Sequence, residues 1–217
     1  MSEKGIQRTH LSAPPIYPIF DSAQWFERLL PLVAQAPRHR ERALWVQLRK
    51  KEGSISDIRQ AIRQIKPLCA EYGCQLIIND YWQIALDEGC DFIHLGQEDL
   101  DTADMAAIRA AGVRLGVSTH DEAELERALR LSPDYVALGP VYHTQLKAMK
   151  WAPQGLEKLA LWKQKVGDIP LIAIGGITIE RAPAVFAAGA DCVSMVTDIS
   201  KNDHPEQRLM QWLQLCP

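Results

Sequence analysis

QLIINDYWQIALDEGCDFIHLGQEDLDTADMAAIRAAGVRLGVSTH, residues 75–120, contains three short apolar runs separated by two segments with helical spacing. The runs at 75–80, 91–96 and 114–120 predict strands, and the segments at 81–89 and 103–112 predict helices. Each predicted helix ends in glycine, which readily takes the left-handed backbone conformation favoured just after a helix. Strands rich in Val, Ile and Leu that alternate with helices are typical of a parallel sheet covered on both faces.

The same alternation extends in both directions along the chain. Further strands are predicted at 16–21, 43–49, 134–141, 170–176 and 191–197, and further helices at 22–36, 56–73, 121–131, 155–167, 178–189 and 204–215. Eight strand–helix units in roughly 200 residues predict an α/β protein with the closed (β/α)8 TIM barrel; the alternative is an open, doubly wound sheet. We expect the polar residues 1–15 to form a flexible N-terminal arm and residues 16–217 to form a single TIM-barrel catalytic domain.

The composition argues against several classes of function. The 217 residues carry a formal net charge of −3, which does not favour nucleic-acid binding. No stretch reaches the ~18 apolar residues of a membrane span, and the N-terminus lacks the apolar segment of a secretory signal. The five cysteines form no CxxC pair, so neither a disulfide framework nor a zinc ribbon is predicted. We expect a cytoplasmic protein whose partners are small molecules, with no nucleic acid and no membrane.

Basic residues end the second predicted strand. In a (β/α)8 barrel, catalytic side chains lie at the C-terminal ends of the strands. Gln47, Arg49 and Lys51 occupy every second position there, so they share one face of an extended chain. Two cations and an amide on one face predict an anion clamp. The alternative is a solvated basic strand end, because exposed Arg and Lys are common.

Acidic residues follow the next two strands. Asn79 and Asp80 end the third strand, and Asp99 follows the fourth. Carboxylates at neighbouring strand ends favour Mg²⁺, which binds one or two carboxylates and bridges to a substrate phosphate. The alternative is that Asp80, and either Asp99 or Asp101, cap the helices that follow them.

The ends of the last strands predict a phosphate site. Gly176, in IAIGGI, ends the seventh strand, and Val196 and Thr197 end the eighth. Many barrels bind phosphate with these two loops, where glycine lets backbone N–H groups approach an oxyanion. On the fifth strand, Ser118 is a candidate phosphate donor. His120 has no acidic partner visible nearby in the sequence, so it receives no catalytic role.

Seven motifs, in order, resemble the thiamine-phosphate synthase family. HLGQED and GVSTH are specific to this family and its close relatives, whereas IGGI is shared by many phosphate-binding barrels. Together the motifs cover nearly the whole chain. They are QLRKK (47–51), LIINDYWQIAL (76–86), IHLGQEDL (93–100), LGVSTHDEAEL (115–125), YVALGPVYHTQLK (135–147), PQGLEKL (153–159) and AIGGITIERAPAV (173–185).

The resemblance implies a transferase that condenses 4-amino-5-hydroxymethyl-2-methylpyrimidine diphosphate with 4-methyl-5-(2-phosphoethyl)thiazole or its carboxylated form. The products are thiamine phosphate and pyrophosphate. Family enzymes work by dissociation: pyrophosphate leaves, a pyrimidine-methyl cation forms, and the thiazole nitrogen captures it. Such a step needs charge neutralisation on the leaving group more than it needs a base. The resemblance also implies a homodimer, because barrels of this family usually pair.

The resemblance implies a role for each matching residue. Asp80 and Asp99 would bind Mg²⁺, which would bridge the pyrophosphate. Gln47 would contact the pyrimidine. The catalytic donors to the diphosphate would be Arg49, Lys51, Ser118 and Lys147, with Asn79 as a further donor. The thiazole phosphate would be held by Thr144, Gly176, Val196 and Thr197.

Two departures from the family pattern fall in the thiazole-phosphate half of the site. Leu146 replaces the second threonine of a P-T-x-T-K loop, and Asp198 replaces alanine after the eighth strand. A carboxylate beside a phosphate site would weaken anion binding, or it would instead cap the next helix. Two alternatives to the transferase therefore stay open: a thiazole tautomerase-like isomerase and a non-catalytic phosphate-binding barrel. The tautomerase lacks the residues that ionise the diphosphate, and their presence here favours the transferase: Gln47, Arg49, Lys51, Asp80 and Asp99.

Overall fold

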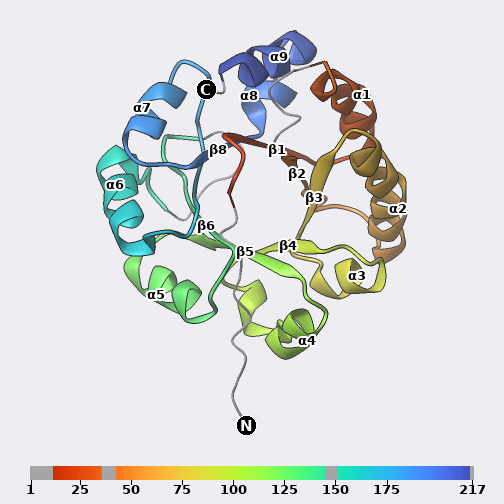
Figure 1. Cartoon of the computed structure of the whole chain (residues 1–217), viewed down its shortest axis with the longest axis horizontal. Coiled ribbons are helices and arrows are strands. Elements are labelled where there is room, and N and C mark those ends of the chain that lie inside the picture. Colours follow the sequence, from red (N-terminus) through yellow and green to blue (C-terminus); the bar gives the residue numbers. More distant parts are fainter. Residues whose placement is uncertain (1–11, 36–42, 145–150, 216–217) are drawn as a thin grey trace.

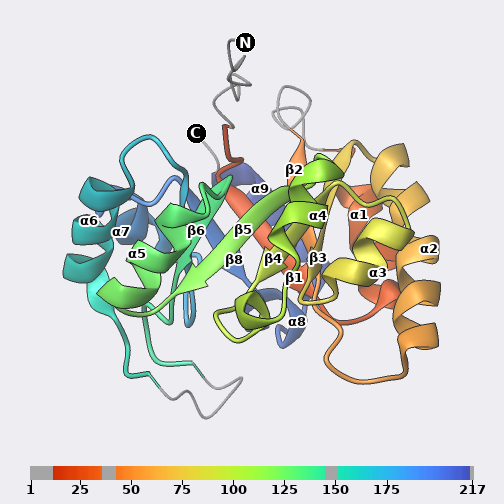
Figure 2. The same ribbon diagram turned by 90° about the horizontal axis from the view of Figure 1, so that it is seen from below.

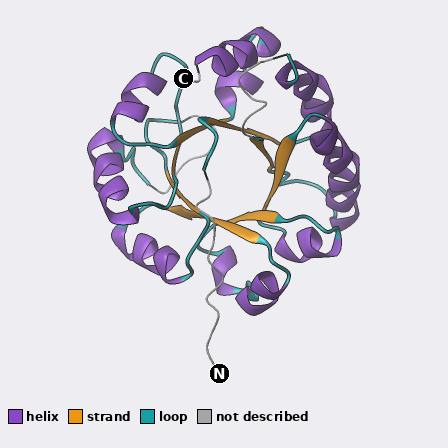
Figure 3. Cartoon of the chain, in the orientation of Figure 1, coloured by secondary structure: helices purple, strands orange, loops and turns teal. Residues whose placement is uncertain are grey.

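The computed structural model describes residues 12–35, 43–144 and 151–215. Eight parallel strands form a closed barrel in which each strand pairs with its neighbours in chain order, and the helices surround it (Figures 1 and 3). The predicted (β/α)8 barrel is therefore confirmed. The strands are β1 (Ile16–Phe20), β2 (Leu44–Leu48), β3 (Cys74–Asn79), β4 (Phe92–Leu95), β5 (Arg114–Thr119), β6 (Tyr135–Leu138), β7 (Leu171–Ile174) and β8 (Cys192–Met195).

Local sequence signals set the ends of the outer helices. Ser54 and Asp57 form a capping box at the start of the second helix, and Gly73 follows its end with a φ of 64°. The helices are α1 (Ala23–Val33), α2 (Ile55–Glu71), α3 (Trp82–Asp87), the 3-10 helix η2 (Asp99–Asp101), α4 (Met105–Ala110), α5 (Glu122–Arg130), α6 (Gly155–Val166), α7 (Ala182–Ala187), α8 (Thr197–Ser200) and α9 (Pro205–Leu215).

Two short elements were missed by the sequence prediction, and both follow barrel strands. Residues 191–197 were predicted as one strand, but β8 ends at Met195 and Thr197 begins the helix α8. The segment before α4 contains η2, and Asp104 caps α4 by accepting from the N–H groups of Ala106 and Ala107. A four-residue or three-residue helix is too short to show helical periodicity, so pattern alone could not reveal either one.

Parallel strands covered on both faces give the molecule two apolar layers. The larger layer lies between the barrel and the helices, and the smaller one fills the barrel interior. The interior is aromatic: Tyr17, Trp45, Phe92 and Tyr135 pack with ring centroids 5.2–5.9 Å apart. The barrel is therefore a packed core, with room for function only at its ends.

The first described residues pack against the barrel. Ala13 belongs to the interior cluster, and the Pro15 carbonyl accepts from the Val193 amide at 2.9 Å. Residues 1–11 of the predicted arm lie outside the described residues. The arm and the domain boundaries stay predictions. None of the helices in the described ranges has the length and hydropathy needed to cross a lipid bilayer.

Candidate active site

The predicted site residues gather at one end of the barrel. Figure 2 shows the loops that follow the strands, and α8, at this end, which we call the mouth. Lys147 and Leu146 lie outside the described residues. The others lie at or just beyond strand ends: Gln47 on β2 with Arg49 and Lys51 just after it, Asn79 on β3 with Asp80 just after it, Asp99 after β4, Ser118 on β5, Thr144 after β6, Gly176 after β7, and Val196 and Thr197 after β8.

Asp80 and Asp99 form a carboxylate pair at the mouth. Their carboxyl groups lie within hydrogen-bonding reach of one another. Burial, and then the negative charge of Asp80, raise the pKa of Asp99. The Gly96 amide donates to Asp99 Oδ2 at 2.9 Å, and the Lys51 ammonium pairs with Asp80. Two carboxylates held together against their mutual repulsion suit a hard cation.

The N-cap alternative for these two residues is wrong. The N-cap position of α3 is Tyr81, without a side-chain bond, and Asp104 caps α4. Asp80 instead has a φ of 66°, a left-handed conformation that is uncommon for a residue other than glycine. Such strain persists where the surrounding structure fixes a functional geometry. Asp101, the other cap candidate, pairs with Arg127.

The three residues at the end of β2 do not act as one exposed face. Gln47 is 1% exposed and donates through Nε2 to the Tyr17 hydroxyl at 2.5 Å, inside the barrel. Lys51 reaches Asp80. The pKa of His94 is lowered to about 4, chiefly by burial. The negative charge of Asp80 opposes this shift, and the positive charges of Arg49 and Lys51 contribute to it. Both cations therefore act on the same interior histidine.

A buried chain of hydrogen bonds runs through the barrel interior to the mouth. The Tyr17 hydroxyl lies 3.0 Å from the Tyr135 hydroxyl, which lies 2.7 Å from His94 Nδ1. His94 Nε2 lies 2.7 Å from the hydroxyl of Ser118. Gln47 supplies the other end of the chain through its bond to Tyr17.

One direction gives every proton from Tyr17 to His94 an acceptor within this chain. In that direction Gln47 Nε2 donates to the Tyr17 hydroxyl, Tyr17 donates to Tyr135, and Tyr135 donates to His94 Nδ1. Because the lowered pKa keeps His94 neutral, its one proton lies on Nε2 and is donated to Ser118. The Ser118 hydroxyl hydrogen is then left for an acceptor in the mouth. The arrangement presets Ser118 as a donor to an oxyanion.

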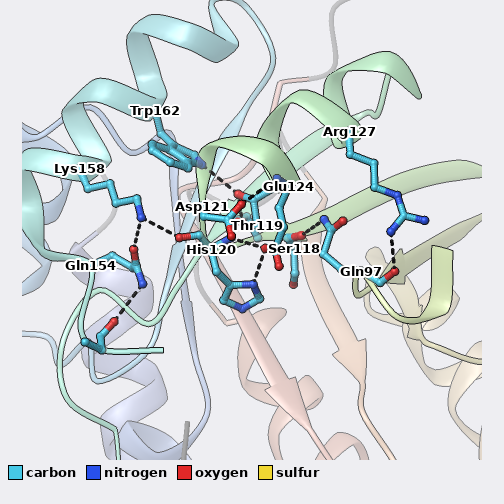
Figure 4. Close-up of polar contacts among 12 residues, drawn as sticks. Gln97, Ser118, Thr119, His120, Asp121, Glu124, Arg127, Gln154, Lys158 and Trp162 are labelled. Carbon is cyan, nitrogen blue, oxygen red and sulfur yellow. Dashed lines mark hydrogen bonds and ion pairs between the residues drawn. The ribbon is translucent and has the colours of Figure 1, made fainter. Parts of the chain in front are cut away.

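Tyr17, His94 and Tyr135 were not among the residues predicted from the sequence. His94 stands inside the HLGQED motif, but its apolar neighbours gave no sign of which way it points. The prediction that His120 has no acidic partner nearby is wrong, because Glu124, four residues on, lies 2.8 Å from its Nδ1. In Figure 4, His120 and Ser118 lie between Lys158 on one side and Gln97 on the other.

The loop after β7 approaches other backbone closely. Gly176 has a φ of 62°, and a Cβ atom there would lie 2.3 Å from the His143 carbonyl oxygen. The Gly176 carbonyl accepts from Arg181 Nη1 at 2.6 Å, and that guanidinium lies 4.7 Å from the Tyr142 ring centroid. Only glycine fits this position, because a side chain would collide with the loop after β6. The absence of a side chain lets the loops after β6 and β7 approach each other.

Asp198 is neither exposed nor a cap. The N-cap position of α8 is Val196, and Asp198 lies in the first turn with its side chain 9% exposed. Its two oxygens accept from Arg208 at 2.8 and 2.9 Å, and Oδ2 also accepts from the Trp212 indole at 2.7 Å. The carboxylate beside the predicted phosphate site is thus paired with a cation from α9.

A closed parallel barrel with acidic, basic and hydroxyl side chains collected at its C-terminal mouth is the layout of a (β/α)8-barrel enzyme. The family model described as thiamine monophosphate synthase matches residues 16–199. The chain therefore belongs to the thiamine monophosphate synthase family, a family of transferases.

Curated relatives and solved structures agree with this assignment. The thiamine-phosphate synthase of Rhizobium etli is 59% identical over 199 residues, which cover 92% of this chain and 93% of the relative. That of Enterobacter sp. (strain 638) is 44% identical over 201 residues, 93% of this chain and 91% of the relative. A thiamine phosphate pyrophosphorylase from Pyrococcus furiosus has the same fold, with a TM-score of 0.76 at 22% identity over 94% of this chain and 96% of its own.

Proposed function

We propose that this chain is a thiamine-phosphate synthase. It would join 4-amino-5-hydroxymethyl-2-methylpyrimidine diphosphate to 4-methyl-5-(2-phosphoethyl)thiazole, or to the carboxylated thiazole, and release pyrophosphate. The observation that carries the proposal is the Asp80–Asp99 carboxylate pair, with Lys51 bound to it and the preset Ser118 hydroxyl in the same mouth. Family membership supports the same activity.

The carboxylate pair fits Mg²⁺. Among the described residues, no group of three or more His, Cys, Asp or Glu side chains is placed to hold a metal. Magnesium does not need such a group, because it commonly binds one or two carboxylates and completes its shell with water and substrate phosphate. When bound by Asp80 and Asp99, Mg²⁺ would supply positive charge to neutralise the diphosphate.

The residues of the chain itself would hold and stabilise the leaving group. Arg49 and Lys51 would offset the charge that pyrophosphate gains as the carbon–oxygen bond breaks, and Ser118 would donate a hydrogen bond to one of its oxygens. Asn79 is 6% exposed, which suits a fixed amide donor at the strand end. By resemblance, Lys147 would add a further cation. No side chain needs to remove a proton for the bond to break.

The other substrate would occupy the opposite half of the mouth. Gly176, Val196 and Thr197, with Thr144, would hold the thiazole phosphate. The pyrimidine belongs to the diphosphate substrate, and Gln47, whose Nε2 donates to Tyr17, would contact it from inside the barrel. Asp198 was one reason to consider a non-catalytic barrel with a weakened phosphate site. Its pairing with Arg208 counts against that alternative, because the cation offsets the negative charge of the carboxylate. We expect the enzyme to work in the cytoplasm, and the family resemblance implies that it is a homodimer.

A steady-state assay separates the three candidate functions. We expect product formation that requires both substrates and Mg²⁺ and that stops when the metal is chelated. Isomerisation of the thiazole without the diphosphate substrate would favour the tautomerase. Tight binding of thiazole phosphate without turnover of either kind would favour the non-catalytic barrel.

A further inference from the structure

Arg208 on α9 joins the two loops that follow β7 and β8. Its Nε and Nη2 atoms donate to the two carboxylate oxygens of Asp198 on α8, at 2.8 and 2.9 Å. Nη1 and Nη2 donate to the two carboxylate oxygens of Glu180, which follows β7, at 3.1 Å each. Nη1 also donates to Gln211 Oε1 at 3.2 Å. All five N–H groups of the guanidinium therefore have an acceptor.

The Asp198 end of this cluster is buried and the Glu180 end is not. The side chains of Asp198 and Arg208 are 9% and 14% exposed, whereas that of Glu180 is 67% exposed. A buried carboxylate needs its cation, because removing one partner leaves an uncompensated charge in a poorly solvated place. Asp198 directly follows Thr197, so that charge would lie beside the proposed phosphate position.

We propose that Arg208 is a positioning residue for the half of the mouth that binds thiazole phosphate. It neutralises Asp198 and ties α8 to the loop after β7, so that Thr197 and Gly176 face one ligand phosphate. The proposal rests on the proposed function, because the ligand is the thiazole phosphate of that reaction. Asp198 departs from the family pattern, and its negative charge is offset by Arg208, which lies ten residues later in the chain.

The first test removes the cation and then the carboxylate that it neutralises. Arg208→Ala should raise the KM for thiazole phosphate on the order of tenfold, which corresponds to about 1.4 kcal/mol of lost binding free energy. The KM for the pyrimidine diphosphate should stay within twofold. Adding Asp198→Ala to Arg208→Ala should return the first KM to within threefold of the wild type, because the unpaired negative charge is gone. Removal of the buried charge would also restore stability, so the readout specific to positioning is the change in the KM for thiazole phosphate while the KM for the pyrimidine diphosphate stays constant.

A second variant keeps the proposal testable where Arg208→Ala fails to fold. Asp198→Asn preserves the shape of the side chain and removes one of the two negative charges paired with Arg208, so that Arg208 and Glu180 balance each other. It should lower the KM for thiazole phosphate by about twofold to fivefold, the opposite sign to Arg208→Ala. An unchanged or raised KM in Asp198→Asn would contradict the proposal.

The matched control is Arg63→Ala, which removes an arginine from another ion-paired cluster. Arg63 lies on α2 and donates to both oxygens of Glu88, which follows α3 at the end of the barrel away from the mouth. It should leave both KM values within twofold of the wild type. Wild-type turnover combined with an unchanged KM in Arg208→Ala would overturn this inference alone. A wild type that neither turns over nor binds thiazole phosphate in calorimetry would overturn the proposed function and this inference with it.

Discussion

The two halves of the barrel mouth are built from different parts of the polypeptide. The half after β2 to β5 presents side chains, namely the Asp80–Asp99 pair, Lys51 and Ser118, and the buried chain from Gln47 fixes one of them from within. The half after β7 and β8 presents backbone at Gly176 and the start of α8, and its support comes from Arg208 on an outer helix. The first half suits charge neutralisation during a reaction, and the second suits a phosphate that only has to be held.

This difference predicts separate kinetic effects. Changes in the side-chain half should lower kcat, because they act on the leaving group. Changes in the backbone half should raise the KM for thiazole phosphate and leave kcat nearly constant, because they act on binding alone.

The largest effect is expected from Asp99→Ala. Loss of one carboxylate of the pair should lower kcat on the order of a thousandfold, because the metal loses a ligand at the leaving group. Asp101→Ala is the matched control: it lies two residues along η2, pairs with Arg127 and is 65% exposed, so it should change kcat less than twofold. Equal kcat values and equal Mg²⁺ dependence in Asp99→Ala and wild type would remove the distinction between the halves.

The next effect concerns the backbone half and compares two glycines. Gly176 and Gly112 have similar φ values, 62° and 69°, but a Cβ at Gly112 meets nothing within 4 Å. Gly112→Ala should cost about 1–2 kcal/mol of unfolding free energy, from backbone strain alone. Gly176→Ala should cost about 2 kcal/mol more, from the clash with His143, and should also raise the KM for thiazole phosphate. Urea unfolding and kinetics of the two variants check this, and equal losses would contradict the close approach.

A third effect tests the buried chain through its dependence on pH. The pKa of His94 is about 4 in the folded protein, below its value of 6.5 in the unfolded chain, so the unfolded state binds the proton more tightly. Stability should therefore fall as pH drops from about 6.5 to about 4, by up to about 3 kcal/mol. Urea unfolding from pH 7 to pH 4.5 should show this slope in the wild type and a flatter slope in His94→Asn. Parallel slopes would mean that His94 is not held neutral.

The smallest effect concerns Leu146, which lies outside the described residues. Leu146→Thr restores the family threonine and should lower the KM for thiazole phosphate a few-fold, by roughly the 0.5–1.5 kcal/mol of one added hydrogen bond. Thr144 is two residues away, and Thr144→Ala should raise the same KM. If Leu146→Thr changes nothing, the loop after β6 holds the phosphate differently from the family.

The sequence was most informative where topology alone decides position. Alternating strands and helices predicted the barrel, and the barrel rule then located Asp80, Asp99 and Ser118 at one end. The interior chain was not predictable in the same way. Its partners Tyr17 and Tyr135 are 118 residues apart, and β1 and β6 are apolar runs that do not reveal which side chains face inward. Pairing across such a distance needs the three-dimensional register.

Charge pairing was also hard to predict from the sequence. Asp198 looked unfavourable beside a phosphate site because its partner Arg208 lies on a different helix. In contrast, His120 and Glu124 stand four residues apart and contact each other, a spacing that the sequence does contain. Residues four apart at the start of a helix lie close together, so this contact was predictable from the spacing.

The central claim is that Asp80 and Asp99 hold a divalent ion against the departing diphosphate. A crystal structure of the protein with Mn²⁺ and pyrophosphate, located by anomalous scattering, tests it most directly. We predict one Mn²⁺ ion bound to both carboxylates and to the pyrophosphate, with the Ser118 hydroxyl donating to a pyrophosphate oxygen. Pyrophosphate and metal bound elsewhere, with neither carboxylate coordinated, would contradict the account.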